Sequence, residues 1–486
     1  MTSEWQRLHQ TQLGQMISES NKLTPFEAFA YCFGDIIGSG IFVSPYQILK
    51  FSGSIGLSFI IWVAGALIAI IGALVYVELG TKIRKPGCDF AYLTHAGWTP
   101  IAVPFLYVSC FLIYPTILAI QTVSFGAYIV DGFKNIMCLD DYSQYVLKHL
   151  VGLIALLVLV FINMFSLRSF AGKLQIAVTV SKLAVISLIL LVGFYYLIFK
   201  DGYKHFDNAF LGTTSDPGDM GMALYASLYA YNGWDILNFG TNEVENPRKS
   251  LPIAGLGGIL SAAVLYVGIN VAYMAVLTKE EFLSGETVAV QFARRSMGDF
   301  SYVVPFLIGV LFLGNLNTTI FGCSRYVLAG AKTGYFPSYL KAVNPASMSP
   351  RCAVLAELIV AVIISLVADL EHLMGIMTFA MWSQRAIVQI CLLWMRYKGF
   401  IYPKDAFVTP IFMPVLFFCI SIALIVVPAL DHYYVAIAAP LLILCGCFVY
   451  FVVLPHTNRP FLVKIDHYML VLFQILLNVD VVEKSD

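Results

Sequence analysis

Three glycines and a proline interrupt the first long apolar run of the chain, which covers about residues 24–51. The interruption, residues 34–45, reads Gly-Asp-Ile-Ile-Gly-Ser-Gly-Ile-Phe-Val-Ser-Pro, and both glycine and proline disfavour an unbroken helix. In a membrane, N–H groups freed by such a break find no water. Together with the positive end of a half-helix, they form a site suited to a carboxylate. The alternative is that Gly38, Ser39 and Gly40 only allow helices to pack closely.

Asn232 and Gly233 interrupt a second apolar run, at about residues 219–243. The interrupted stretch, residues 229–235, reads Tyr-Ala-Tyr-Asn-Gly-Trp-Asp. These are the first and sixth apolar runs, so each begins a set of five if the fold contains two inverted repeats. Paired interruptions in corresponding spans are typical of transporter binding sites. The pairing therefore favours the binding-site interpretation over the packing one.

Three cationic side chains lie inside apolar runs, where ionisable groups are costly and usually functional. Lys182 is in the fifth run. Instead of serving a functional role there, its side chain could simply extend to the cytosolic interface. Arg385 is near the middle of the tenth run, where a buried guanidinium needs a carboxylate from the substrate or from the protein. Arg325, near the inner end of the eighth run, is expected to belong to a cytosolic gate. Asp35 and Asp235 could pair with either arginine or select a cationic substrate.

The composition predicts that these residues are positioned by membrane-spanning helices. Of the 486 residues, 59% are hydrophobic and 12% are charged, whereas about a quarter are charged in soluble domains. We predict an all-α integral membrane protein with twelve transmembrane helices: two inverted five-helix repeats with broken helices 1 and 6, plus two extra helices. The predicted spans lie at about residues 24–51, 57–81, 100–130, 146–167, 171–199, 219–243, 254–278, 299–331, 351–368, 371–396, 407–428 and 431–455.

The sequence predicts one transporter domain, residues 24–455, between cytosolic segments 1–23 and 456–486. Lysines and arginines are more frequent in the segments that share a side with the N-terminus, so both termini are expected in the cytosol. The N-terminal segment is polar and has no signal-peptide apolar region. The net charge of zero speaks against a nucleic-acid partner. The domain divides into repeats at about 24–199 and 219–396 and helices 11 and 12 at about 407–455.

Both interrupted segments resemble those of a known transporter superfamily. Gly-Ser-Gly-Ile-Phe-Val-Ser-Pro, at 38–45, resembles the first span of amino acid–polyamine–organocation transporters. Ala-Tyr-Asn-Gly-Trp, at 230–234, with Asn-Glu-Val-Glu-Asn-Pro-Arg-Lys-Ser, at 242–250, resembles the light, catalytic subunits of heteromeric amino acid transporters. The resemblance covers about residues 24–455. It implies a twelve-helix inverted-repeat fold, sodium-independent amino acid exchange, and a single-span heavy-chain glycoprotein as partner in the plasma membrane.

The resemblance also implies roles for individual residues. The substrate α-carboxylate falls on the backbone of residues 37–40, and the α-ammonium on carbonyls around Ile36 and from 229 to 233. Tyr229 corresponds to an aromatic gate, although it could be a plain core aromatic. Lys182 matches a lysine whose ammonium stands where sodium-coupled relatives bind sodium. The predicted substrate-binding residues are Ile36, Ile37, Gly38, Ser39, Gly40, Tyr114, Tyr229, Ala230, Asn232, Gly233, Asp235, Trp382 and Arg385.

Cys138 is the one cysteine, of ten, that this topology places in an outer loop. An odd cysteine on the oxidising side suggests an intermolecular disulfide, and a free exposed thiol is the alternative. The resemblance implies that Cys138 bonds to the heavy chain. The sequence has no metal-ligand cluster and its histidines are scattered, so we expect no metal, no cofactor and no enzyme activity.

The expected substrates are anionic amino acids, namely aspartate and glutamate, together with cystine. A relative that exchanges cystine and glutamate carries an arginine at the position of Met381, one helical turn from Arg385. A second arginine of that relative corresponds to Tyr114. The chain is therefore most similar to the cystine/aspartate/glutamate-transporting member. The alternative is exchange of neutral or cationic amino acids, with Asp235 taking part in substrate selection.

Overall fold

The computed structural model describes residues 23–85, 87–133, 140–165, 168–285, 287–345, 349–367, 370–431, 437, 441, 444–453 and 460–481. Within these ranges the chain forms helices and no strands. The first half contains α2 Pro25–Ile36, α3 Gly40–Ser52, α4 Ile55–Lys82, α5 Cys88–His95, α6 Thr99–Val108, η1 Ser109–Ile113, α7 Tyr114–Phe133, α8 Asp141–Phe165, α9 Arg168–Phe199 and η2 Gly202–Phe206.

The second half is also all-helical, with long α-helices, the short 3-10 helices η3, η4 and η5, and the short π-helix η6. Its elements are α10 Pro217–Ala230, η3 Ile236–Glu243, α11 Pro247–Val276, α12 Lys279–Phe282, α13 Val288–Ser296, η4 Gly298–Tyr302, α14 Val304–Lys332, η5 Ser338–Lys341, α15 Arg351–Val367, α16 Leu370–Tyr397, α17 Phe412–Asp431, η6 Val449–Val453 and α19 Pro460–Leu477.

The first span is broken, as predicted. A capping box between Thr24 and Glu27 starts α2. This helix ends at Ile36, α3 begins at Gly40, and the two half-helices are bent by 47°. The glycine-rich stretch identified in the sequence is therefore the site of the break.

The sixth span is also broken, as predicted. Asp216 caps α10 by accepting a hydrogen bond from the N–H of Gly218. The helix ends at Ala230, and the chain continues through a turn into the 3-10 helix η3. Gly233 has φ of +108° in this turn, a backbone conformation that favours glycine.

Eight described helical segments are long and apolar enough to cross a membrane, and the bent pair α2–α3 makes a ninth span. The protein is therefore a multi-pass membrane protein. Two further predicted spans correspond to α10 with η3 and to α15, which has 17 residues. The predicted twelfth span, 431–455, lies mostly outside the described residues.

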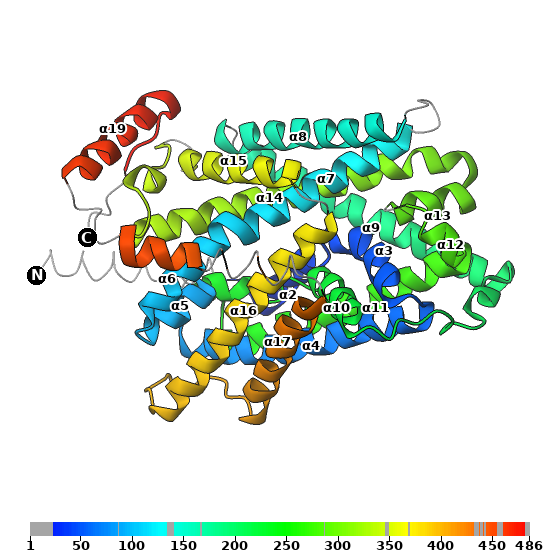
Figure 1. Cartoon of the computed structure of the whole chain (residues 1–486), viewed down its shortest axis with the longest axis horizontal. Coiled ribbons are helices and arrows are strands. Elements are labelled where there is room, and N and C mark those ends of the chain that lie inside the picture. The colour runs from blue at the N-terminus through cyan, green and yellow to red at the C-terminus, as the bar shows by residue number, and fades with distance from the viewer. Residues whose placement is uncertain are drawn as a thin grey trace, which may run out of the picture.

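Segments that are distant in the sequence surround the two breaks. The half-helix α2 packs against α11, and α3 packs against α10, while α7 packs against α14. Figure 1 shows α7, α8, α14 and α15 on one side of the molecule and α4, α16 and α17 on the other, with α2 and α3 between them. This arrangement brings both breaks to the middle of the bundle.

The sequence did not predict the final helix, α19. Leu470, Phe473 and Leu477 of this helix pack against a small core that includes Val327 and Phe336. Ser338 N–H also donates to the Asp466 carboxylate at 2.9 Å. The segment after the last predicted span is therefore anchored to the helical bundle.

Candidate substrate site

The break between α2 and α3 exposes unpaired backbone donors. The N–H groups of Ser39, Gly40 and Ile41 donate to no described residue, because the first bonds of α3 run from Phe42 and Val43 to the Ser39 carbonyl. These three groups lie at the positive end of α3. The break can therefore bind an anion such as a carboxylate.

The two breaks touch each other. A Cβ added to Gly40 would lie 2.5 Å from the Cα of Ala230, so only glycine permits this approach. The Ser39 Oγ and the Tyr229 hydroxyl are 3.0 Å apart, and both residues are buried. Residues predicted from two separate motifs thus form one site, with Tyr229 beside the free N–H groups.

The carbonyls predicted to hold an α-ammonium already have donors. The Tyr266 hydroxyl lies 2.6 Å from the Ile36 carbonyl oxygen and 2.8 Å from that of Ala230. The Ile36 carbonyl also accepts from the Gly38 N–H at 2.7 Å. Sequence reasoning missed Tyr266, whose only signal was a tyrosine inside the apolar run of α11.

Lys182 lies against the first break. Its ammonium donates to the Ile37 carbonyl and lies 3.4 Å from the Gly34 carbonyl oxygen and 3.5 Å from Asn315 Oδ1. The residue is 7% exposed, so the side chain does not extend to the surface. Lys182 therefore places a positive charge where the helix dipole of α2 ends.

Arg385 pairs with Asp235. Its Nη2 atom is 3.3 Å from Asp235 Oδ2 and also 3.3 Å from Asn232 Oδ1. The guanidinium carbon lies 4.6 Å from the ring centre of Trp234 and 5.2 Å from that of Trp382. Arg385 is only 2% exposed. Its charge is therefore balanced by a carboxylate of the protein, and two indole rings lie beside the guanidinium.

Of three other predicted residues, two contact neighbours outside the breaks and one lies outside the residues that the structure describes. Tyr114 packs its ring 5.2 Å from that of Tyr326, in the second hydrophobic core. Arg325 stacks on Phe321 and donates to its carbonyl at 3.0 Å. Cys138 lies outside the described residues.

The site is open on the side of the molecule where α2 begins. An exposed stripe runs along α2 through Tyr31 and Asp35, while Cys32 and Ile36 on the opposite face are buried against α11. A second exposed stripe on α14, beyond Asn315, includes Thr318 and Phe321. Because Lys182 contacts both helices near the break, the two stripes begin close together.

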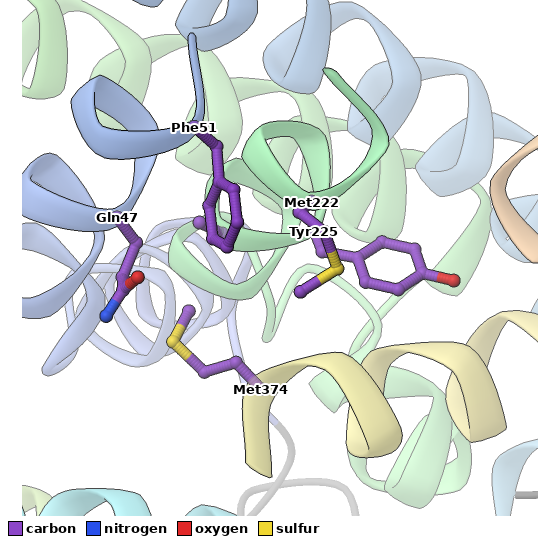
Figure 2. Close-up of a pocket in the computed structure, with 6 residues that line it drawn as sticks. Gln47, Phe51, Met222, Tyr225 and Met374 are labelled. Atoms are coloured by element: carbon purple, nitrogen blue, oxygen red, sulfur yellow. The ribbon is translucent and has the colours of Figure 1, made fainter. Parts of the chain in front are cut away.

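The opposite side is closed. Tyr128 of α7 packs its ring 6.3 Å from Phe42 of α3 and donates to the Phe42 carbonyl at 3.1 Å. Figure 2 shows Gln47, Phe51, Met222 and Met374 directed into one small pocket between α3, α10 and α16. Among the described residues, these contacts close the breaks on the α3 side.

Sequence comparison with known proteins identifies the family to which the chain belongs. The amino acid permease family matches residues 23–454. The chain belongs to this family. The human cystine/glutamate transporter is 32% identical over 403 residues, which cover 83% of this chain and 79% of the relative. The human b(0,+)-type amino acid transporter 1 is 32% identical over 422 residues, covering 87% and 85%.

A third relative is more similar in sequence. Amino acid transporter protein 6 of Caenorhabditis elegans is 39% identical over 416 residues, which cover 86% of this chain and 79% of the relative. The family is one of membrane transporters, and the relatives are named as amino acid transporters. The free N–H groups at the first break therefore suit the carboxylate that every amino acid carries.

Proposed function

We propose that this permease is a sodium-independent amino acid exchanger that works by alternating access. The observation that carries the proposal is the meeting of two broken helices around free N–H groups, with access from one side. The substrate α-carboxylate binds the N–H groups of residues 39–41, and Tyr229 covers it. The side that is open here is the cytosolic one. The positive charge of Lys182 at the break takes the place of a sodium ion, which accounts for sodium independence.

The pairing of Arg385 with Asp235 supports neutral or cationic side chains as substrates. An anionic side chain would have to displace Asp235 from a guanidinium that is already held by Asn232 and two indoles. Leaving Asp235 without its partner would cost free energy. Aspartate, glutamate and cystine remain the second candidate class, because one relative is a cystine/glutamate transporter and Arg385 adjoins the second break.

Exchange into proteoliposomes distinguishes these substrate classes. In sodium-free buffer, the protein is expected to take up labelled leucine and arginine, and uptake should need an amino acid inside the vesicle. Aspartate, glutamate and cystine should be poor substrates. Arg385→Ala should reduce all uptake, because it leaves the Asp235 carboxylate unpaired. Dominant uptake of aspartate or cystine, lost selectively in Arg385→Ala, would contradict the assignment and identify Arg385 as the group that binds the substrate side chain.

We also propose that the chain is the light subunit of a heterodimer, linked through Cys138 to a single-span heavy-chain glycoprotein. Membranes from cells that make both chains should show a large species on non-reducing gels. Reduction should convert this species to the 53.8 kDa chain and its partner. Cys138→Ser should abolish the large species, whereas Cys419→Ser, at an exposed free cysteine, should not. Persistence of the species in Cys138→Ser would overturn the assignment.

A further inference from the structure

Asp35 carries a carboxylate that is directly beside both breaks. It lies on the last turn of α2, four positions before Ser39. A Cβ added to Gly233 would be 2.5 Å from Asp35 Oδ2, so the carboxylate rests against the turn that follows α10. Only glycine at position 233 leaves room for it. Asp35 thus touches the second break while it belongs to the first.

The neighbouring charges bond directly to other groups, whereas Asp35 interacts with its nearest cation, Lys182, only through space. Asp235 pairs with Arg385 at 3.3 Å, and Lys182 donates to the carbonyls of Gly34 and Ile37. Across the part of the chain that the structure describes, the Asp35 carboxylate makes no hydrogen bond and no ion pair. Of Asp35 and Asp235, therefore, Asp35 is the one whose carboxylate oxygens can accept a hydrogen bond from a ligand without losing a direct bond to the protein.

Asp35 is also accessible from the open side. The residue is exposed, whereas Ile36 and Ile37, which follow it, are each 1% exposed. It forms the inner end of the exposed stripe along α2. A group that enters from this side meets Asp35 before it reaches the N–H groups of residues 39–41. An accessible carboxylate attracts cations and discriminates against anions by simple charge complementarity.

We infer that Asp35 is a specificity residue that binds the ammonium or guanidinium group of a cationic substrate side chain. This inference rests on the proposed amino acid exchange and names one substrate class for it. The α-carboxylate of lysine or arginine binds the N–H groups of residues 39–41, while the positive end of the side chain bonds to Asp35. Neutral amino acids use the first contact alone. The carrier therefore accepts both classes, and Asp35 sets the preference between them.

The test compares arginine and leucine as substrates of the full chain in proteoliposomes. Initial rates give KM and maximal rate for both amino acids in wild type, Asp35→Asn and Asp35→Glu. Asp35→Asn should raise the KM for arginine about tenfold or more, as expected for loss of a charge-assisted bond, and change the KM for leucine much less. Asp35→Glu should restore most of the arginine affinity. Asp207→Asn, at an exposed loop position, is the matched control.

Outcomes that differ from this selective loss of arginine affinity would overturn the role of Asp35. Equal changes for arginine and leucine would show that Asp35 binds the α-ammonium or supports the fold, and unchanged kinetics would show that it binds neither. If Asp35→Asn does not elute as a folded protein, Asp35→Thr replaces it. Failure of wild type to transport any amino acid would overturn the proposed function itself. Leucine uptake without arginine uptake would overturn only the role of Asp35.

Discussion

Replacing Gly40 by alanine is expected to abolish transport while leaving the protein folded. The new Cβ would lie 2.5 Å from the Cα of Ala230 and 2.9 Å from its Cβ. Because these neighbours are backbone or backbone-anchored atoms, α3 and α10 must separate. The N–H groups of residues 39–41 then leave the position that we propose for binding the α-carboxylate. A misplacement of about 1 Å can cost about a hundredfold in rate, and uptake should fall by at least this much.

The measurement is amino acid exchange into proteoliposomes at equal protein density. Gly322→Ala is the matched control, because Gly322 lies within α14 and a Cβ there meets nothing within 4 Å. This control should transport at the wild-type rate. Size-exclusion elution and thermal unfolding in detergent should be similar for both variants. Wild-type exchange by Gly40→Ala would show that the close approach of α3 to α10 is not needed to form the site.

Replacing Glu78 by glutamine is expected to destabilise the protein more than any surface change. Glu78 is 0% exposed, and its Oε1 lies 2.6 Å from Lys82 Nζ and 2.9 Å from Arg396 Nε. Its Oε2 pairs with Arg396 Nη2 and accepts from the Thr409 N–H at 2.9 Å. This cluster joins α4, α16 and the segment that precedes α17. Glutamine leaves the buried Lys82 ammonium and the partly buried Arg396 guanidinium without a counter-charge, at a cost of about 3–5 kcal/mol.

Thermal unfolding in detergent measures this effect, together with the yield of folded protein from membranes. Glu280→Gln is the matched control, since Glu280 is exposed on the short helix α12. A surface change of this kind alters the free energy of unfolding by about 0.5 kcal/mol or less. A stability of Glu78→Gln equal to that of Glu280→Gln would contradict the expectation and show that water replaces the lost charge.

The proposed alternating access assigns different roles to the two regions. Gly40 and Ala230 belong to broken helices whose halves can tilt separately, because their backbone bonds are already interrupted. The Glu78 cluster instead holds unbroken helices together through several charged groups. We therefore expect substitutions at the breaks to change transport rates, and substitutions in the Glu78 cluster to change stability.

Much of the fold followed from local chemistry. Apolar runs long enough to cross a membrane identify helices whatever their neighbours are, because hydrocarbon excludes unpaired backbone groups. Glycines at 38 and 40 and the Asn232-Gly233 pair predicted both breaks, since these residues weaken a helix wherever they occur. The helix α19 was not predicted, because its apolar surface was interpreted as part of a cytosolic tail.

The sequence by itself determined the class of protein, the two breaks and the residues that carry charge inside the spans. Only the tertiary structure decided which charges meet. Arg385 and Asp235 are 150 positions apart, and their pairing depends on how α16 and the turn after α10 pack. Within the described residues, the same packing leaves the Asp35 carboxylate without a direct hydrogen bond or ion pair, and it directs Tyr266 to the carbonyls of both breaks. Helical periodicity determines which face a residue occupies on its own helix, whereas its partner depends on the rotation and position of another helix.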